Sequence, residues 1–159
     1  MRTGGAGAWW AVAAVAWAGA GCAVPVMAPL DLAQPGWRVR EAEVVWRPSA
    51  KAPELMGELS VARHVDGRQW VQFGKQGLPW LTARRGPSGW TLETTMRRGV
   101  AGGRGQPPSR VPWFLLDDMP PSRPPAGSPW RLEASGTLPG AGWRLANEAT
   151  GEVVEGTVP

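Results

Sequence analysis

Few residues of this 159-residue chain have the types and spacing that chemistry requires. The one histidine, His64, lies two residues before Asp66, and a histidine beside a carboxylate can act as a general base. Asp117 and Asp118 are adjacent, but successive residues of a helix point about 100° apart, so they are not expected to share a proton. The chain has no Gly-x-Ser-x-Gly elbow, no His-Glu-x-x-His and no Cys/His metal spacing. We expect no enzyme, metal or cofactor, and keep a hydrolase using His64 as an alternative.

The single cysteine, Cys22, is a candidate for covalent modification. Arg2 supplies a positive start, an uncharged run spans 8–20, and the small residues Gly19, Ala20 and Gly21 precede the cysteine. This run is shorter than the about 20 apolar residues that cross a bilayer, and it is typical of a secretory signal. The arrangement resembles the lipobox of bacterial lipoproteins, with Gly19 where that family usually has leucine.

The lipobox resemblance implies a signal peptide over 1–21 and a mature chain that begins at an acylated Cys22. Two or more acyl chains anchor a protein stably, at roughly 0.8 kcal/mol per buried methylene. Ala23 follows the cysteine where Asp would favour the inner membrane, so the expected location is the bacterial outer membrane, facing the periplasm. The alternatives are a secreted protein with a free Cys22 thiol and a membrane helix. Membrane lipid is the expected partner; nucleic acid is not expected for an exported chain.

Residues 22–36 read as the acylated N-terminus and a tether, because they contain Pro25, Pro29 and Pro35 and no clear periodicity. Residues 37–159 are expected to form one domain. The mature chain keeps one cysteine, so no intramolecular disulfide is possible. The net charge of +4 is mild, but a basic face would be attracted to anionic lipid headgroups.

Period-two patterns predict strands through most of the domain. Ala42, Val44 and Trp46 alternate with polar residues. The stretch 55–65 places Leu55, Leu59, Val61 and Val65 inward, and in 90–96 Trp90, Leu92 and Met96 share a face. Asp66-Gly67 marks one hairpin and 149–151 a closing one. We predict a mainly β fold: a curved antiparallel sheet, or half-barrel, with one short helix or helical turn over 111–119, which Ser109 can cap, on or near the concave face.

Tryptophan is frequent, and it often follows a turn residue at the predicted start of a strand. One interpretation is that the indoles fill the core of a protein that has two phenylalanines and no tyrosine. The other is a concave surface that accepts a lipid or acyl chain, since an indole offers apolar area and one N–H donor. The candidate ligand-binding residues are Trp46, Trp70, Trp90, Trp113 and Trp143.

The stretch 74–86 has two readings. Leu78 and Trp80 beside Gly77 and Pro79 would form an exposed apolar loop tip, which is costly unless it meets a membrane or a partner. Alternatively 78–84 is a strand buried on both faces.

The lipobox, the run "GELSVARHVDGRQWVQFGKQGLPWLTARRGPSGWTLE" and the closing "GWRLANEATGEVVEG" resemble lipoproteins of the LolA/LolB type over about residues 37–158. The resemblance implies a half-barrel whose cavity receives lipoprotein acyl chains, and a role in lipoprotein localisation. It also implies Leu78 or Trp80 as the apolar membrane-contact residue. The chain has fewer helical segments than those carriers. A non-catalytic structural or interaction lipoprotein with a protein partner in an envelope complex is the alternative.

Overall fold

The computed structural model describes residues 24–96, 99–137 and 140–158. They form one antiparallel sheet in the order β6-β5-β4-β3-β2-β1-β9-β8-β7. The strands are β1 Trp37–Arg47, β2 Leu55–His64, β3 Gln69–Lys75, β4 Leu78–Gly86, β5 Gly89–Thr94, β6 Gly99–Gly103, β7 Trp130–Ser135, β8 Gly142–Asn147 and β9 Glu152–Thr157. Because β6 and β7 are the two edges of this order, the sheet is open. The prediction of a mainly β, antiparallel fold is confirmed.

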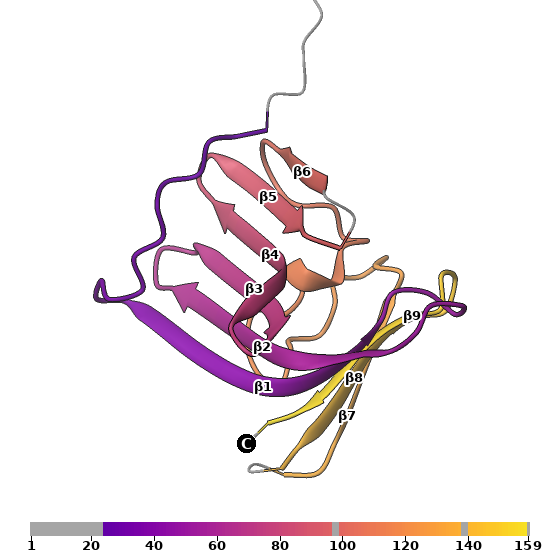
Figure 1. The fold of residues 1–159 in the computed structure, drawn as a ribbon. Helices are drawn as coiled ribbons and strands as arrows, with labels where there is room; N and C mark the ends of the chain where they lie inside the picture. The colour runs from indigo at the N-terminus through magenta and orange to yellow at the C-terminus, as the bar shows by residue number, and fades with distance from the viewer. Residues whose placement is uncertain (1–23, 97–98, 138–139, 159) are drawn as a thin grey trace, which may run out of the picture.

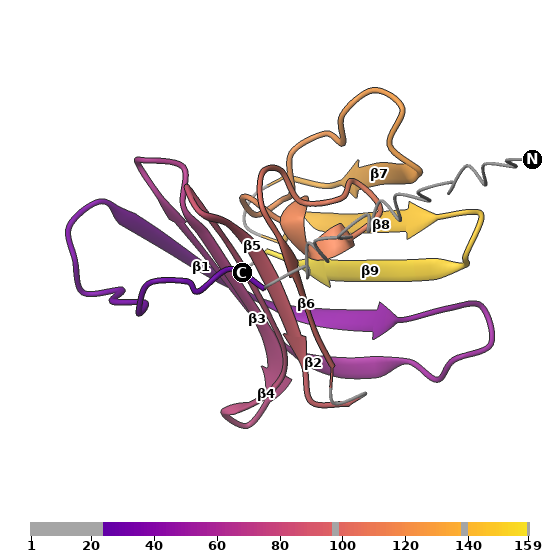
Figure 2. The ribbon, with the colours of Figure 1, turned by 90° about the horizontal axis from the view of Figure 1, so that it is seen from above.

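The sheet is strongly curved (Figures 1 and 2). The two longest strands, β1 and β2 with 11 and 10 residues, run from a half formed with β3–β6 to a half formed with β7–β9. The hollow between the halves holds the segment that connects β6 to β7. The fold is therefore a half-barrel whose open side is covered by a connecting segment.

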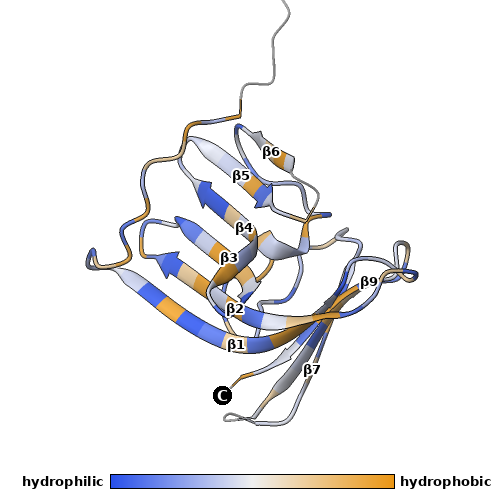
Figure 3. Ribbon diagram, in the orientation of Figure 1, coloured by the Kyte–Doolittle hydropathy of each residue, from blue (hydrophilic) through white to orange (hydrophobic). Residues whose placement is uncertain are grey.

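Alternation along the strands builds the core on the hollow side. Val44, Leu59, Val61 and Phe73 are almost fully buried, and Figure 3 shows apolar and polar residues alternating along β1 to β4. Two residues near strand ends were wrongly predicted to face the core. Val65 lies in the turn after β2 and is 86% exposed, and Met96 lies beyond β5 and is 41% exposed.

The helix predicted over 111–119 is a single 3-10 turn, η1, at Pro112–Phe114. Pro112 does occupy its first turn, as predicted, but Ser109 is not the cap: Val111 precedes the turn and no side chain caps it. The rest of the segment is irregular yet buried at Leu116 and Met119. Pro120 and Pro121 follow Met119, and the residue before a proline is disfavoured in the helical conformation.

Residues 24–36 lie along one end of the strands, which we call the N-terminal rim. Val65 N–H donates to the Gly36 carbonyl at 3.1 Å, and Ser88 Oγ donates to Met27 Sδ at 3.5 Å. Val24 lies against Gly102 of β6, since a Cβ on that glycine would come within 2.8 Å of a Val24 methyl. The rim comprises residues 24–36 and the turns at 65–68 and 87–88. The opposite end, with the turn at Gln76–Gly77, is the distal rim.

Candidate functional site

Two of the five candidate tryptophans meet in the middle of the hollow. Trp46 of β1 and Trp113 of η1 have ring centroids 5.0 Å apart, and Phe73 of β3 stacks on Trp113 at 5.6 Å. Trp46 is 8% exposed and Trp113 is 2% exposed. The three rings pack on one another as a core does, and they fill the hollow in this conformation.

The other candidates occupy three different places. Trp90 is half-buried and its ring lies 5.7 Å from that of Phe114. Trp143 of β8 is buried within the same apolar cluster. Trp70 alternates with the buried Val71, so it lies on the opposite face of the sheet and outside the cluster. Phe73, Phe114 and Trp130 belong to the cluster but were not among the candidates, although Trp130 follows a turn residue as Trp90 and Trp143 do.

The tryptophans also differ in whether the indole N–H has a hydrogen-bond acceptor. Trp46 Nε1 donates to Glu152 Oε1 at 3.0 Å, and Trp130 Nε1 donates to the Arg110 carbonyl at 3.1 Å. Burial raises the pKa of Glu152, and the hydrogen bond from Trp46 partly opposes that rise. Trp143 Nε1 is buried and has no partner within the described residues.

The segment Pro112–Met119 covers the hollow, and we call it the plug. Its apolar side chains are buried: Trp113, Phe114, Leu116 and Met119. Gln69 Nε2 donates to the Leu116 carbonyl at 2.9 Å. Asp117 and Asp118, the adjacent carboxylates of the sequence, pair with Arg63 at 3.3 Å and Arg40 at 4.0 Å. Their observed role is to hold the plug to β1 and β2 by partly exposed ion pairs.

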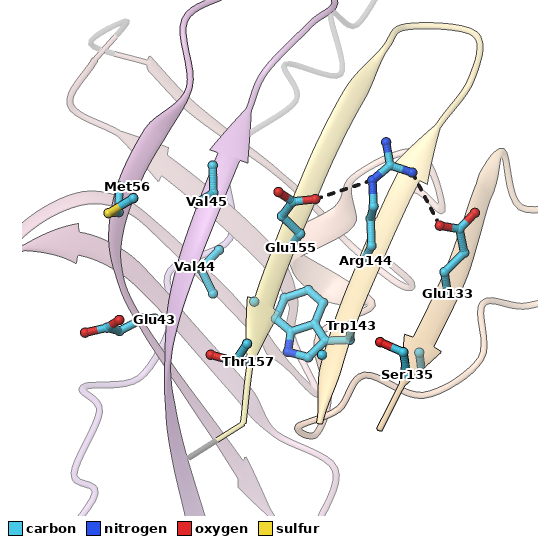
Figure 4. Close-up of a pocket in the computed structure, with 13 residues that line it drawn as sticks. Glu43, Val44, Val45, Met56, Glu133, Ser135, Trp143, Arg144, Glu155 and Thr157 are labelled. Carbon is cyan, nitrogen blue, oxygen red and sulfur yellow. Dashed lines mark hydrogen bonds and ion pairs between the residues drawn. The ribbon is translucent and has the colours of Figure 1, made fainter. Parts of the chain in front are cut away.

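A groove of about 540 Å³ crosses β1, β9, β8 and β7. Figure 4 shows Arg144 between two carboxylates, with Nε 3.4 Å from Glu155 and Nη1 3.5 Å from Glu133. Val45 and Met56 are among its apolar lining residues. Val45 alternates with the buried Val44, so the groove opens mainly on the face away from the core. The groove lining also includes Glu43. With three carboxylates and one arginine, it does not suit an anionic lipid.

Leu78 and Trp80 lie at the start of β4, on the distal rim. Leu78 is 69% exposed, whereas the Trp80 ring packs on Phe73 with centroids 5.4 Å apart. The stretch 78–84 is a strand, as the second interpretation predicts, but it is buried on one face only, at Leu81 and Ala83. Leu78 is an exposed apolar tip, and Trp80 belongs to a strand packed on the core.

His64 lies at the N-terminal rim with both ring nitrogens occupied. Its side chain is 12% exposed, and Nδ1 is 2.8 Å from Asp66 Oδ1. Nε2 lies 3.0 Å from the Pro35 carbonyl, which can only accept, so Nε2 carries the proton and donates. The backbone N–H of Arg68 lowers the pKa of Asp66 below its usual value. His64 thus ties the N-terminal segment to the β2–β3 turn through contacts of both ring nitrogens.

Cys22 and the signal peptide predicted over 1–21 lie outside the described residues. Within 24–96, 99–137 and 140–158, no group of three or more His, Cys, Asp or Glu residues is placed to hold a metal ion. Over the same ranges no helix is long and apolar enough to cross a membrane.

No protein-family model matches the chain, and no curated protein matches it significantly.

Proposed function

We propose that the chain is a non-catalytic lipoprotein of the bacterial outer membrane, anchored through acylated Cys22 and facing the periplasm. Its LolB-like half-barrel binds an apolar ligand such as a lipid or a lipoprotein acyl chain, consistent with a role in lipoprotein localisation. The ligand enters the hollow of the sheet and replaces the plug there. The anchor is supported by the lipobox resemblance around Cys22.

One observation carries the ligand-binding proposal. The hollow is lined by aromatic side chains and is closed by an irregular connection rather than by a strand of the sheet. A few polar contacts tie the plug to the sheet, among them Gln69 to Leu116 and the two ion pairs of Asp117 and Asp118. Exposed ion pairs of this kind contribute about 0–1 kcal/mol each. The plug is therefore held mainly by apolar burial, which an acyl chain can replace.

The free energy of burying the plug side chains is similar to that of burying an acyl chain. Four buried plug side chains contribute about 1.5–3 kcal/mol each, or about 6–12 kcal/mol together. An acyl chain entering from water gains about 0.8 kcal/mol per methylene, so about 12 buried methylenes give about 10 kcal/mol. An acyl chain that comes from a bilayer is already out of water, so its transfer free energy is far smaller. In that case the exchange requires the apolar side chains of the displaced plug to be covered by lipid or by the incoming acyl chain.

The test uses a fluorescent fatty acid, dansyl-undecanoic acid, with the full processed chain. We expect saturable binding that unlabelled palmitate competes away. Leu116→Ala weakens the plug, so it should tighten the binding several-fold. Trp70→Ala is the matched control, because Trp70 lies outside the apolar cluster and should leave the affinity unchanged. Absence of saturable binding, or weaker binding by Leu116→Ala, would reject the proposal.

The filled core favours a second candidate, a non-catalytic lipoprotein that docks on an envelope complex. Trp46, Phe73 and Trp113 leave the hollow occupied, while Leu78 is exposed at the distal rim. A photo-crosslinking residue at position 78 should then capture one protein in native envelopes. The same residue at position 131, on an exposed part of β7, serves as the control. Equal capture at both positions, or none, would count against docking through Leu78.

A further inference from the structure

A small pocket lies between the N-terminal segment and the strand ends of the N-terminal rim. Its volume is about 80 Å³, several times the roughly 10–15 Å³ that one water needs. Residues 27–30 form one wall, and the ends of the strands form the other. The polar residues that line it are Trp37, Arg68, Gln69, Arg84, Arg85 and Ser88.

Two buried hydrogen-bond donors of this pocket lack acceptors. Arg84 Nε and Trp37 Nε1 are both buried without a partner among the described residues. An unpaired buried donor costs free energy that a suitable acceptor would recover. Gln69 contributes no acceptor to this pocket, because its side chain lies on the core face and donates from Nε2 to the Leu116 carbonyl. Arg84 and Trp37 both line the pocket, which therefore offers two donors to a ligand.

Positive charge is in excess around the pocket. Arg68 is paired with Asp66 at 2.8 Å, but within the part of the chain described here Arg84 and Arg85 make no ion pair of 4.0 Å or less. The other acidic group near this rim, Asp31, accepts the Ala33 N–H. An anion in the pocket would meet two guanidinium groups that no carboxylate balances.

We infer that this pocket binds the phosphate of an anionic phospholipid headgroup. A guanidinium can hold phosphate through two parallel hydrogen bonds, and the Trp37 N–H supplies a further donor. The source of the phosphate is a bilayer, an assignment that rests on the proposed anchor at Cys22. Val24 is the second residue after Cys22, and two residue steps span at most about 7 Å.

Exposed apolar side chains on the same rim agree with a lipid surface. Val26 is 93% exposed and Val65 is 86% exposed. Arg104, also exposed, follows β6 beside Gly89. Valines and arginines at one end of the strands match a bilayer surface, where apolar side chains meet lipid and basic ones meet headgroups.

The test follows the indole N–H of Trp37 by NMR. The full processed chain, with ¹⁵N-labelled tryptophan, is kept in dodecyl maltoside micelles, and Trp37→Phe assigns the signal. We expect dihexanoyl-phosphatidylglycerol to shift this signal downfield in a saturable way. Arg84→Gln should weaken the affinity about tenfold, as expected for loss of a charge-assisted pair. Arg131→Gln is the matched control, because it removes one charge from a side chain that is 68% exposed on β7.

The outcomes separate the source of the phosphate from the presence of a site. An equal shift with inorganic phosphate or with dihexanoyl-phosphatidylcholine would overturn the anionic headgroup as ligand. No saturable shift with any of the three, or an equal loss in Arg131→Gln, would overturn the pocket. The other seven tryptophan signals of the processed chain report folding, and if Arg84→Gln unfolds the chain, Arg85→Gln decides in its place. Acylation of Cys22 is read separately, from the mass of the N-terminal peptide.

Discussion

Gly156 shows how a single residue controls the packing of an indole. It lies in β9 between Val44 of β1 and Trp143 of β8. A Cβ at this position would lie 2.8 Å from the Glu43 carbonyl oxygen, 2.9 Å from a Val44 methyl and 3.0 Å from the Trp143 ring. These distances are shorter than van der Waals contact, and one of them involves backbone. The missing side chain is what lets the Trp143 ring lie across β9.

Gly156→Ala should therefore destabilise the fold by about 1–3 kcal/mol, the usual cost of overpacking. The measurement is the midpoint of urea unfolding. Gly142→Ala is the control on the neighbouring strand, because its Cβ would meet the flexible Ser135 hydroxyl at 3.3 Å. A loss in Gly142→Ala as large as that in Gly156→Ala would contradict this account of the Trp143 contact.

Glu152 makes stability depend on pH. Burial raises the pKa of its carboxyl in the folded state, so near that pKa the folded chain binds more protons than the unfolded chain. Stability then falls as pH rises through the folded pKa. Glu152→Gln keeps an acceptor for the Trp46 N–H but carries no charge, so it should raise stability at pH 7.

The gain of Glu152→Gln should shrink as the pH falls below the unfolded pKa, where the wild-type carboxyl is protonated in both states. Urea unfolding between pH 3 and pH 7 measures it. Glu148→Gln, which removes a carboxylate whose side chain is 74% exposed, should give no such gain. A gain in stability of Glu152→Gln that grows toward acid pH would contradict the prediction.

At the scale of elements, the plug completes the core. Trp113 contacts rings from β1 and β3, so Trp113→Ala should cost about 3–5 kcal/mol, the range for truncating a buried aromatic. Trp70→Ala, on the other face of β3, should cost less because its ring is half-buried and outside the cluster. Urea unfolding compares the two. Similar losses would mean that the plug is not part of the core.

The strands were predictable because their signal is local. Alternation identified β1, β2 and β5, and Asp66-Gly67 marks a turn in which Gly67 has a φ of +91°. The plug was not predictable as a single 3-10 turn, because its burial comes from the sheet around it rather than from periodicity. The face on which Trp70 lies was also not predictable, since the stretch 69–73 contains polar and apolar residues at both parities. Which tryptophans meet is decided by the curvature of the sheet.

For the whole molecule, the two rims are too far apart for an upright sheet to place both on one bilayer. Strand β4 has nine residues, which span about 27 Å at roughly 3.3 Å per residue. Val24, the first described residue, lies at the N-terminal rim beside β6, and Leu78 lies at the distal rim. If Cys22 is the anchor, Leu78 points away from the membrane that holds it. An exposed apolar residue there would meet a partner or ligand arriving from the periplasm.

This orientation can be measured with single cysteines at positions 26, 65 and 78. All three side chains are exposed, so Val26→Cys, Val65→Cys and Leu78→Cys should fold. An acylated Cys22 leaves the introduced thiol as the one site for a polarity-sensitive dye in the processed chain. In vesicles with phosphatidylglycerol, we expect blue-shifted emission and quenching by brominated lipid at positions 26 and 65, and neither at 78.

Each alternative arrangement has its own signature in the same measurement. A blue shift at 78 alone would place the distal rim on the bilayer, as the LolB resemblance implies for Leu78, and would reject the orientation. Water-like emission at all three positions would mean that the domain stands away from the surface. Two dyes per chain would reveal an unmodified Cys22 and reject the anchor itself. Because the dye count and the emission are independent, the anchor and the orientation can fail separately.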